Sequence, residues 1–135
     1  MYQAKDALKK IQAAAKEFER ILSTVGGDFG RAVGVLRFSH MQGDISKAND
    51  IASNFAAASM EKNIGSLMAR DDSRYAIGYL IALAYHLDVR EVRYKAMVAL
   101  SRLSQRSEFR AKLDSDKELK SRLLDCLFSV LDGSF

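Results

Sequence analysis

The side chains best suited to metal or nucleophilic chemistry in this 135-residue chain are His40, His86 and Cys126. A metal site needs several such ligands that converge on one ion. These three residues are widely separated and follow no known ligand spacing. We therefore predict no metal-binding residues and no cofactor. The two histidines are expected at helix ends, where a partly charged imidazole suits the carbonyl end.

The sequence also predicts no catalytic residues. Cys126 falls on the apolar side of a predicted helix, near Leu123 and Leu127, and a buried thiol is usually inert. Asp71 and Asp72 are adjacent, so on a helix they point in different directions and suit a helix cap better than an acid–base pair. We expect that the protein is not an enzyme.

The segment "GGDFGR" at residues 26–31 is glycine-rich like a phosphate loop. A phosphate loop, however, has the pattern G-x-x-x-x-G-K-[ST] after a strand, and this segment lacks it. Its two adjacent glycines can instead take left-handed conformations that end a helix. Asp28 is then expected to cap the helix that follows.

Helices are the elements that must position these side chains. The chain has no proline, 48% of its residues are hydrophobic, and helix-forming residues are abundant. The best strand candidate is the short segment "VGVLRF", which we interpret as helical. We predict an all-α domain of about six helices, at residues 3–24, 29–40, 45–70, 75–87 and 88–109 and from residue 116 onward.

These helices are expected to form one domain over residues 1–135. Residues 1–43 would supply an amphipathic helix and a short second helix, and residues 44–135 a repeat-like helical core. The helix at residues 75–87 is apolar nearly all round, which is typical of a helix at the centre of its domain.

The first predicted helix carries apolar side chains at alternating spacings of three and four, which is a heptad pattern. The seam includes Leu8, Ile11, Phe18 and Leu22. Two interpretations are open. The favoured one is an amphipathic helix packed on its own domain, and the alternative is a seam that joins two copies into a homodimer.

The apolar pattern of residues 75–87 returns 44 residues later, where Tyr79 corresponds to Leu123 and Leu83 to Leu127. A period in the low forties is typical of solenoids built from two or three helices per repeat. The alternative is a plain helical bundle, because ordinary packing gives the same spacing.

The segment "DVREVRYKAMVALSRLSQRSEFRAKLDSDKELKSRLLDCLFSVL" resembles an armadillo or HEAT repeat. The residues that match the two helices of such a repeat are Val92, Ala96, Ala99, Leu100 and Leu103, then Leu119, Leu123, Leu124 and Leu127. The resemblance covers residues 67–131; the usual glycine between repeats is missing, and the first half of the chain does not fit. It implies helical-repeat packing and a protein-binding scaffold without chemistry of its own.

Basic residues concentrate in the same region. The chain has a net charge of +4, and residues 90–122 alone carry +5. Lys95, Arg102 and Arg106 fall on one side of the predicted helix, beside its apolar side. Long basic side chains often lay their stems along apolar surface, which is the simpler interpretation. We hypothesise that these residues, with Arg110, form a basic strip that binds an acidic surface of another protein.

The alternative function is a helical nucleic-acid-binding regulatory protein. Attraction to phosphate groups would favour it, but acidic residues are interspersed in the basic region and few aromatic residues accompany them for base stacking.

The chain is expected to be cytoplasmic. It has one cysteine, no signal-peptide pattern at its N-terminus, and no apolar stretch close to the roughly 20 residues that span a bilayer.

Overall fold

The computed structural model describes residues 4–43, 45–85 and 89–131, and these residues form eight helices and no β-strand. In chain order the helices are α1 (Ala4–Thr24), α2 (Phe29–Gly43), α3 (Ile45–Ala58), α4 (Ile64–Met68), α5 (Ser73–Ala84), α6 (Arg90–Leu103), α7 (Ser107–Ser115) and α8 (Lys117–Leu131). The prediction of an all-α fold is confirmed. The predicted number of about six helices is wrong, because α4 and α7 are additional short helices.

The third predicted helix is two helices in the structure, since α3 ends at Ala58 and α4 follows after a turn. Carbonyl groups at a helix C-terminus lack partners within the helix. Here Arg102 donates a hydrogen bond to the carbonyl oxygen of Ala56 (3.0 Å), and Arg106 donates one to that of Glu61 (3.1 Å). Both donors come from α6 or the residues just after it, so the local sequence around residue 58 does not reveal them.

The helix α7 overlaps the end of the helix predicted at residues 88–109 and fills the gap before the helix predicted from residue 116. It has one buried residue, Phe109, which is fully enclosed where α7 packs between α4 and α8. A single anchoring side chain produces no helical periodicity, so the apolar pattern did not predict this element.

The turn between α1 and α2 follows the prediction. Gly26 and Gly27 have positive φ angles of 69° and 83°, and the N–H of Gly27 donates to the carbonyl oxygen of Leu22 at 2.8 Å. This is the hydrogen bond that closes a Schellman motif. The N–H of Arg31 then donates to Oδ1 of Asp28 (3.1 Å), which caps α2 as expected.

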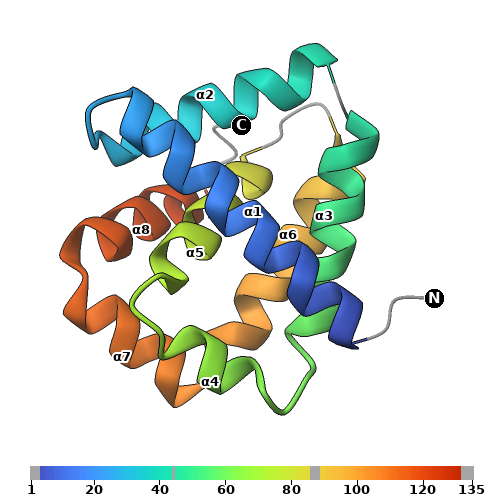
Figure 1. Ribbon diagram of the computed structural model, residues 1–135, viewed down its shortest axis with the longest axis vertical. Coiled ribbons are helices and arrows are strands. Elements are labelled where there is room, and N and C mark those ends of the chain that lie inside the picture. Colours follow the sequence, from blue (N-terminus) through green and yellow to red (C-terminus); the bar gives the residue numbers. More distant parts are fainter. Residues whose placement is uncertain (1–3, 44, 86–88, 132–135) are drawn as a thin grey trace.

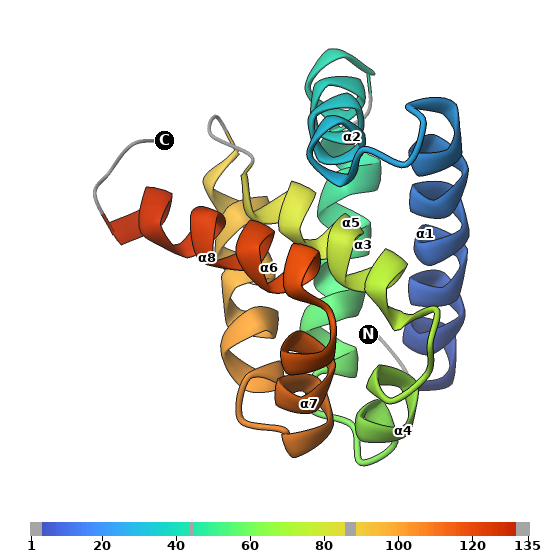
Figure 2. The ribbon, with the colours of Figure 1, turned by 90° about the vertical axis from the view of Figure 1, so that its left-hand side faces the viewer.

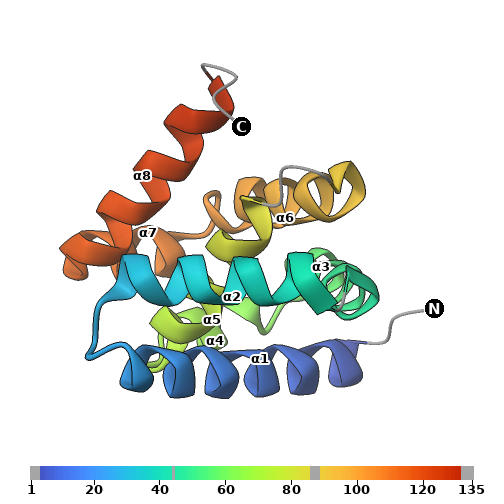
Figure 3. The ribbon, with the colours of Figure 1, turned by 90° about the horizontal axis from the view of Figure 1, so that it is seen from above.

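The helix α5 lies at the centre of the molecule, between α1 on one side and α6 and α8 on the other (Figures 1 and 3). Figure 2 shows α1, α3 and α6 side by side, with α5 and α8 crossing them. Residues 76–84 are all buried, so the predicted central position of this helix is confirmed. Each large aliphatic side chain that it buries contributes about 1.5–3 kcal/mol to stability.

A close contact fixes α1 and α2 on α5. The rings of Phe18 and Phe29 meet edge to face, with centroids 5.1 Å apart. Both lie against Gly78, where an added Cβ would be 2.5 Å from the Phe18 ring and 2.9 Å from the Phe29 ring. The glycine therefore allows the two aromatic rings to rest on the backbone of α5.

The heptad seam of α1 faces the interior of the same chain. Ile11, Phe18 and Leu22 are buried and Leu8 is partly buried, because α1 packs on α5, α3 and α2. A dimer formed through this seam would require α1 to leave that position.

The two helices compared with an armadillo or HEAT repeat share α5 as a neighbour and differ in the other helix on which each packs. The helix α6 packs mainly on α3 and α5, whereas α8 packs on α5 and α7. The resemblance stays a prediction.

An ion cluster attaches α8 to α5. Arg74 Nε donates to Oδ2 of Asp116 (2.7 Å), and its Nη2 donates to Oε1 of Glu118 (3.1 Å). The other carboxylate oxygen of Asp116 accepts the N–H of Leu119 (3.1 Å), so this aspartate also caps α8. The Arg74 guanidinium lies over the ring of Phe29 (5.4 Å), which adds α2 to the junction.

Candidate functional site

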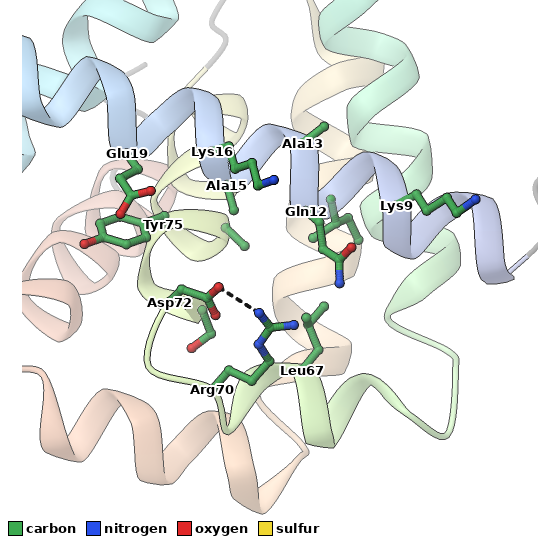
Figure 4. Close-up of a pocket in the computed structure, with 13 residues that line it drawn as sticks. Lys9, Gln12, Ala13, Ala15, Lys16, Glu19, Leu67, Arg70, Asp72 and Tyr75 are labelled. Atoms are coloured by element: carbon green, nitrogen blue, oxygen red, sulfur yellow. Dashed lines mark hydrogen bonds and ion pairs between the residues drawn. The ribbon is translucent and has the colours of Figure 1, made fainter.

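A cleft of about 370 Å³ lies between α1 and the segment from α4 to the start of α5 (Figure 4). We call it the α1–α5 cleft. It is lined by Lys9, Ile11, Gln12, Ala13, Ala15, Lys16 and Glu19 of α1 and by Leu67, Arg70, Asp72, Ser73, Tyr75 and Ala76 of the opposite side. Its volume falls within the range of small-ligand and anchor-residue pockets, roughly 300–1,000 Å³.

Small side chains on α1 open the cleft. Ala15 of α1 and Leu67 of the opposite side both line the cleft, together with buried Ile11 and Ala76. A larger residue at position 15 would occupy this space, but the alanine leaves it empty. The partly exposed side chains of Ala15, Leu67 and Tyr75 form an apolar floor that is accessible in the cleft.

Charged residues surround this floor. Lys9 and Lys16 extend from α1, and both side chains are exposed and have no ion-pair or hydrogen-bond partner among the described residues. Arg70 reaches from the opposite side toward Gln12 (Figure 4) and forms an ion pair with Asp72 at 3.0 Å. Both partners of that pair are about half exposed, so it contributes no more than about 1 kcal/mol and can exchange partners.

The predicted basic strip lies elsewhere, on the side of α6 that faces α3. Lys95 Nζ donates to Ser53 Oγ (2.7 Å) and to Asn49 Oδ1 (3.0 Å), and it also pairs with Glu91 (3.0 Å). The hydrogen bond and the charge of Lys95 lower the pKa of the Glu91 carboxyl.

Arg102 and Arg106 donate to the carbonyl oxygens of Ala56 in α3 and Glu61 in the turn after it, and both arginine side chains are partly buried. Arg110 is exposed and donates to the carbonyl oxygen of Ser104 (3.1 Å). The structure thus places three of the four strip residues along one α6–α3 contact. Their partner-binding role stays a prediction.

The residues considered for metal or nucleophilic chemistry do not gather in the described structure. Cys126 is buried on α8, and burial raises the pKa of its thiol to about 12, so the reactive thiolate is scarce near neutral pH. His40 lies in the last turn of α2, as predicted, and is buried against Tyr79. His86 lies outside the described residues. No three potential metal ligands converge within the described ranges.

An exposed apolar row runs along the outer side of α2. Phe38 is 65% exposed and Val35 is 45% exposed, and Met41 and Ile45 continue the row toward α3. This row was not predicted from the sequence. The signal that could have revealed it is the spacing of three residues between Val35, Phe38 and Met41, which places them on one side of the helix.

Comparisons with protein-family models, with curated protein sequences and with solved structures gave no match. Within the described residues, no helix combines the length and apolarity needed to cross a membrane.

Proposed function

We propose that the chain is a non-enzymatic protein-binding module, and that the α1–α5 cleft receives an apolar side chain from an acidic segment of a partner protein. The observation that carries the proposal is the pairing of an accessible apolar floor with the unpartnered ammonium groups of Lys9 and Lys16. A buried apolar anchor supplies affinity in such contacts, and complementary charges around it supply orientation and specificity.

The position of Arg70 strengthens the proposal. Its guanidinium is exposed at the cleft and pairs only with exposed Asp72 among the described residues. A carboxylate on the partner can take the place of Asp72 at little cost, because an exposed ion pair is weak. The partner's apolar side chain would then lie between Arg70 on one side of the cleft and Lys9 and Lys16 on the other.

The basic strip is the less favourable surface for this partner. Lys95, Arg102 and Arg106 already donate to acceptors on α3 and in the turn that follows it. An incoming carboxylate would have to compete with these internal acceptors, and breaking a partly buried hydrogen bond costs about 1–3 kcal/mol. The resemblance of residues 67–131 to an armadillo or HEAT repeat supports the same class of function, since it implies a protein-binding scaffold.

A selection from a random peptide library displayed on phage tests the proposal. The enriched peptides should carry several Asp or Glu residues around one or two large apolar residues. Their affinity should fall at least about tenfold for Lys9→Glu/Lys16→Glu, and it should weaken as salt is raised. Circular dichroism verifies that the variant folds.

The control variant is Lys62→Glu/Lys117→Glu, which makes the same charge change at two exposed lysines outside the cleft. It should bind the peptides like the wild type. An equal loss of peptide affinity in both variants would show that net charge alone causes the effect. That result would contradict binding in the α1–α5 cleft. Loss on Phe38→Ser alone would assign binding to the apolar row of α2 instead.

Random-sequence DNA and RNA serve as the comparison probes. Binding with a steep salt dependence, unaffected by Lys9→Glu/Lys16→Glu, would favour the nucleic-acid alternative over a protein partner.

A further inference from the structure

A second cavity, of about 190 Å³, lies where α2, α5 and α8 meet. It shares no lining residue with the α1–α5 cleft. Two arginines line it, Arg37 from α2 and Arg122 from α8, together with the aspartate Asp125 and apolar walls that include Ile81. Two guanidinium groups that line one small cavity repel each other, and an anion between them would relieve that repulsion.

Arg37 enters this cavity from α2 with an unsatisfied donor. Its Nε is buried and has no hydrogen-bond partner among the described residues. The guanidinium lies over the ring of Tyr85, with Cζ 5.9 Å from the ring centroid, so the aromatic side chain positions it without accepting its N–H groups. The terminal nitrogens of Arg37, which lines the cavity, also have no hydrogen-bond partner among the described residues. Their N–H groups are the donors that an oxyanion in the cavity could engage.

Arg122 reaches the cavity from the other side because residue 30 is a glycine. A Cβ added to Gly30 would lie 2.9 Å from Cζ of Arg122 and 3.0 Å from each of its terminal nitrogens. The guanidinium therefore rests directly on the first turn of α2. No acceptor for its N–H groups is present among the described residues, so its donors are available to a ligand.

We propose that this cavity binds the oxyanion group of a small organic ligand, a carboxylate or a phosphate monoester, between Arg37 and Arg122. Guanidinium groups present paired N–H donors that match the geometry of both anions. Arg37, Arg122 and Asp125 together give the cavity lining a formal net charge of +1, which favours an anionic ligand. The apolar walls fit an organic group attached to the anion better than a bare ion.

The experiment is an NMR titration of the isotope-labelled full chain at constant ionic strength, with benzoate, phenyl phosphate and inorganic phosphate as separate probes. Neutral benzyl alcohol is the comparison. We expect saturable shifts of the Gly30 and Gly34 amide signals with at least one aromatic anion and none with benzyl alcohol. Preference for benzoate or for phenyl phosphate identifies the anion, and comparison with inorganic phosphate shows what the organic group adds.

Substitutions locate the site. Arg37→Gln and Arg122→Gln should each weaken binding at least about tenfold, the loss expected when one charged hydrogen-bonding group is removed. Asp125→Asn should strengthen it. The control Arg31→Gln removes an exposed arginine of α2 that lies outside the cavity, and it should leave the affinity unchanged.

Gly30→Ala keeps all charges and displaces only the Arg122 guanidinium, so it tests the geometry even if an arginine variant does not fold. It should weaken binding by a similar factor. Absence of saturable shifts with every anion, or an equal effect of Arg31→Gln and Arg37→Gln, would overturn the proposal.

Discussion

Nε2 of His40 lies 2.7 Å from the hydroxyl oxygen of Tyr79, and both side chains are buried where α2 packs on α5. The two rings are tilted by 60°, with centroids 5.5 Å apart. Because this polar contact is buried and directional, it specifies the position of α2 along α5 and also adds to the stability of their packing.

Tyr79→Phe should lower the free energy of unfolding by about 1–2 kcal/mol. The substitution removes the hydroxyl and keeps the ring, so a buried imidazole nitrogen loses this partner while the packing is retained. Urea unfolding followed by circular dichroism measures the change. Tyr94→Phe is the control, because that side chain is 70% exposed; a comparable loss there would mean that the buried hydrogen bond is not the cause.

Gly78→Ala and Gly34→Ala should change stability in opposite directions. At position 78 the new Cβ would meet the buried rings of Phe18 and Phe29, so we expect a loss of about 1–3 kcal/mol. At position 34 it would meet no atom within 4 Å on an exposed part of α2, so the better helix propensity of alanine should add about 0.5–1 kcal/mol. Thermal unfolding of both variants tests this, and the same sign in both would contradict it.

The junction of α5 and α8 should make stability depend on pH. Burial opposes ionisation of Asp116, but the hydrogen bonds from Arg74 and from the N–H of Leu119, with the charge of Arg74, lower the pKa of its carboxyl from its ordinary value. The folded state therefore holds this proton less tightly than the unfolded chain. The stabilisation is fully present above the ordinary pKa and is lost as the pH falls through the lowered value.

Asp116→Asn should accordingly reduce the free energy of unfolding by about 1–2 kcal/mol at neutral pH. It should also flatten the decline of stability that the wild type shows below about pH 4. Urea unfolding between neutral pH and about pH 2.5 measures both effects. Asp114→Asn, at an exposed pair with Lys120 (3.3 Å), should reproduce neither. An unchanged pH profile in Asp116→Asn would show that another carboxyl is responsible.

Arg102→Gln/Arg106→Gln should destabilise the protein by about 1–3 kcal/mol, because the carbonyl oxygens of Ala56 and Glu61 lose charged donors at the end of α3. Thermal unfolding provides the measurement, with exposed Lys117→Gln as the neutral comparison. Peptide binding in the α1–α5 cleft should persist at temperatures where the variant is folded. Unchanged stability together with lost binding would instead support the basic strip as the partner surface.

The features that depend on neighbouring residues in the chain could be predicted from the sequence. The glycine pair at residues 26 and 27, the cap at Asp28 and the all-round apolar character of α5 each follow from neighbouring residues, and the structure confirms them. The helix α7 was not predicted, because its single buried residue, Phe109, produces no helical periodicity in the sequence. The break between α3 and α4 was not predicted either. The arginines that donate to the carbonyl oxygens of Ala56 and Glu61 come from a distant part of the chain.

The candidate site could not be predicted from sequence. The α1–α5 cleft is lined by two alanines of α1, Ala13 and Ala15, and by Leu67 and Ala76 from a distant part of the chain. In the sequence those alanines indicate only a helix that permits close packing. Likewise, the spacing that aligns Lys95, Arg102 and Arg106 on one side of α6 is visible in the sequence, but the α3 acceptors that engage them depend on tertiary packing.

The most direct test of the proposed function is the affinity of a selected acidic peptide for Ala15→Leu, measured by fluorescence anisotropy. The substitution fills the α1–α5 cleft without changing any charge, so affinity should fall at least about tenfold while stability is retained. The control is Ala111→Leu, at an exposed position on α7, which should bind normally. Full affinity of Ala15→Leu would show that the peptide does not enter the cleft and would contradict the proposal.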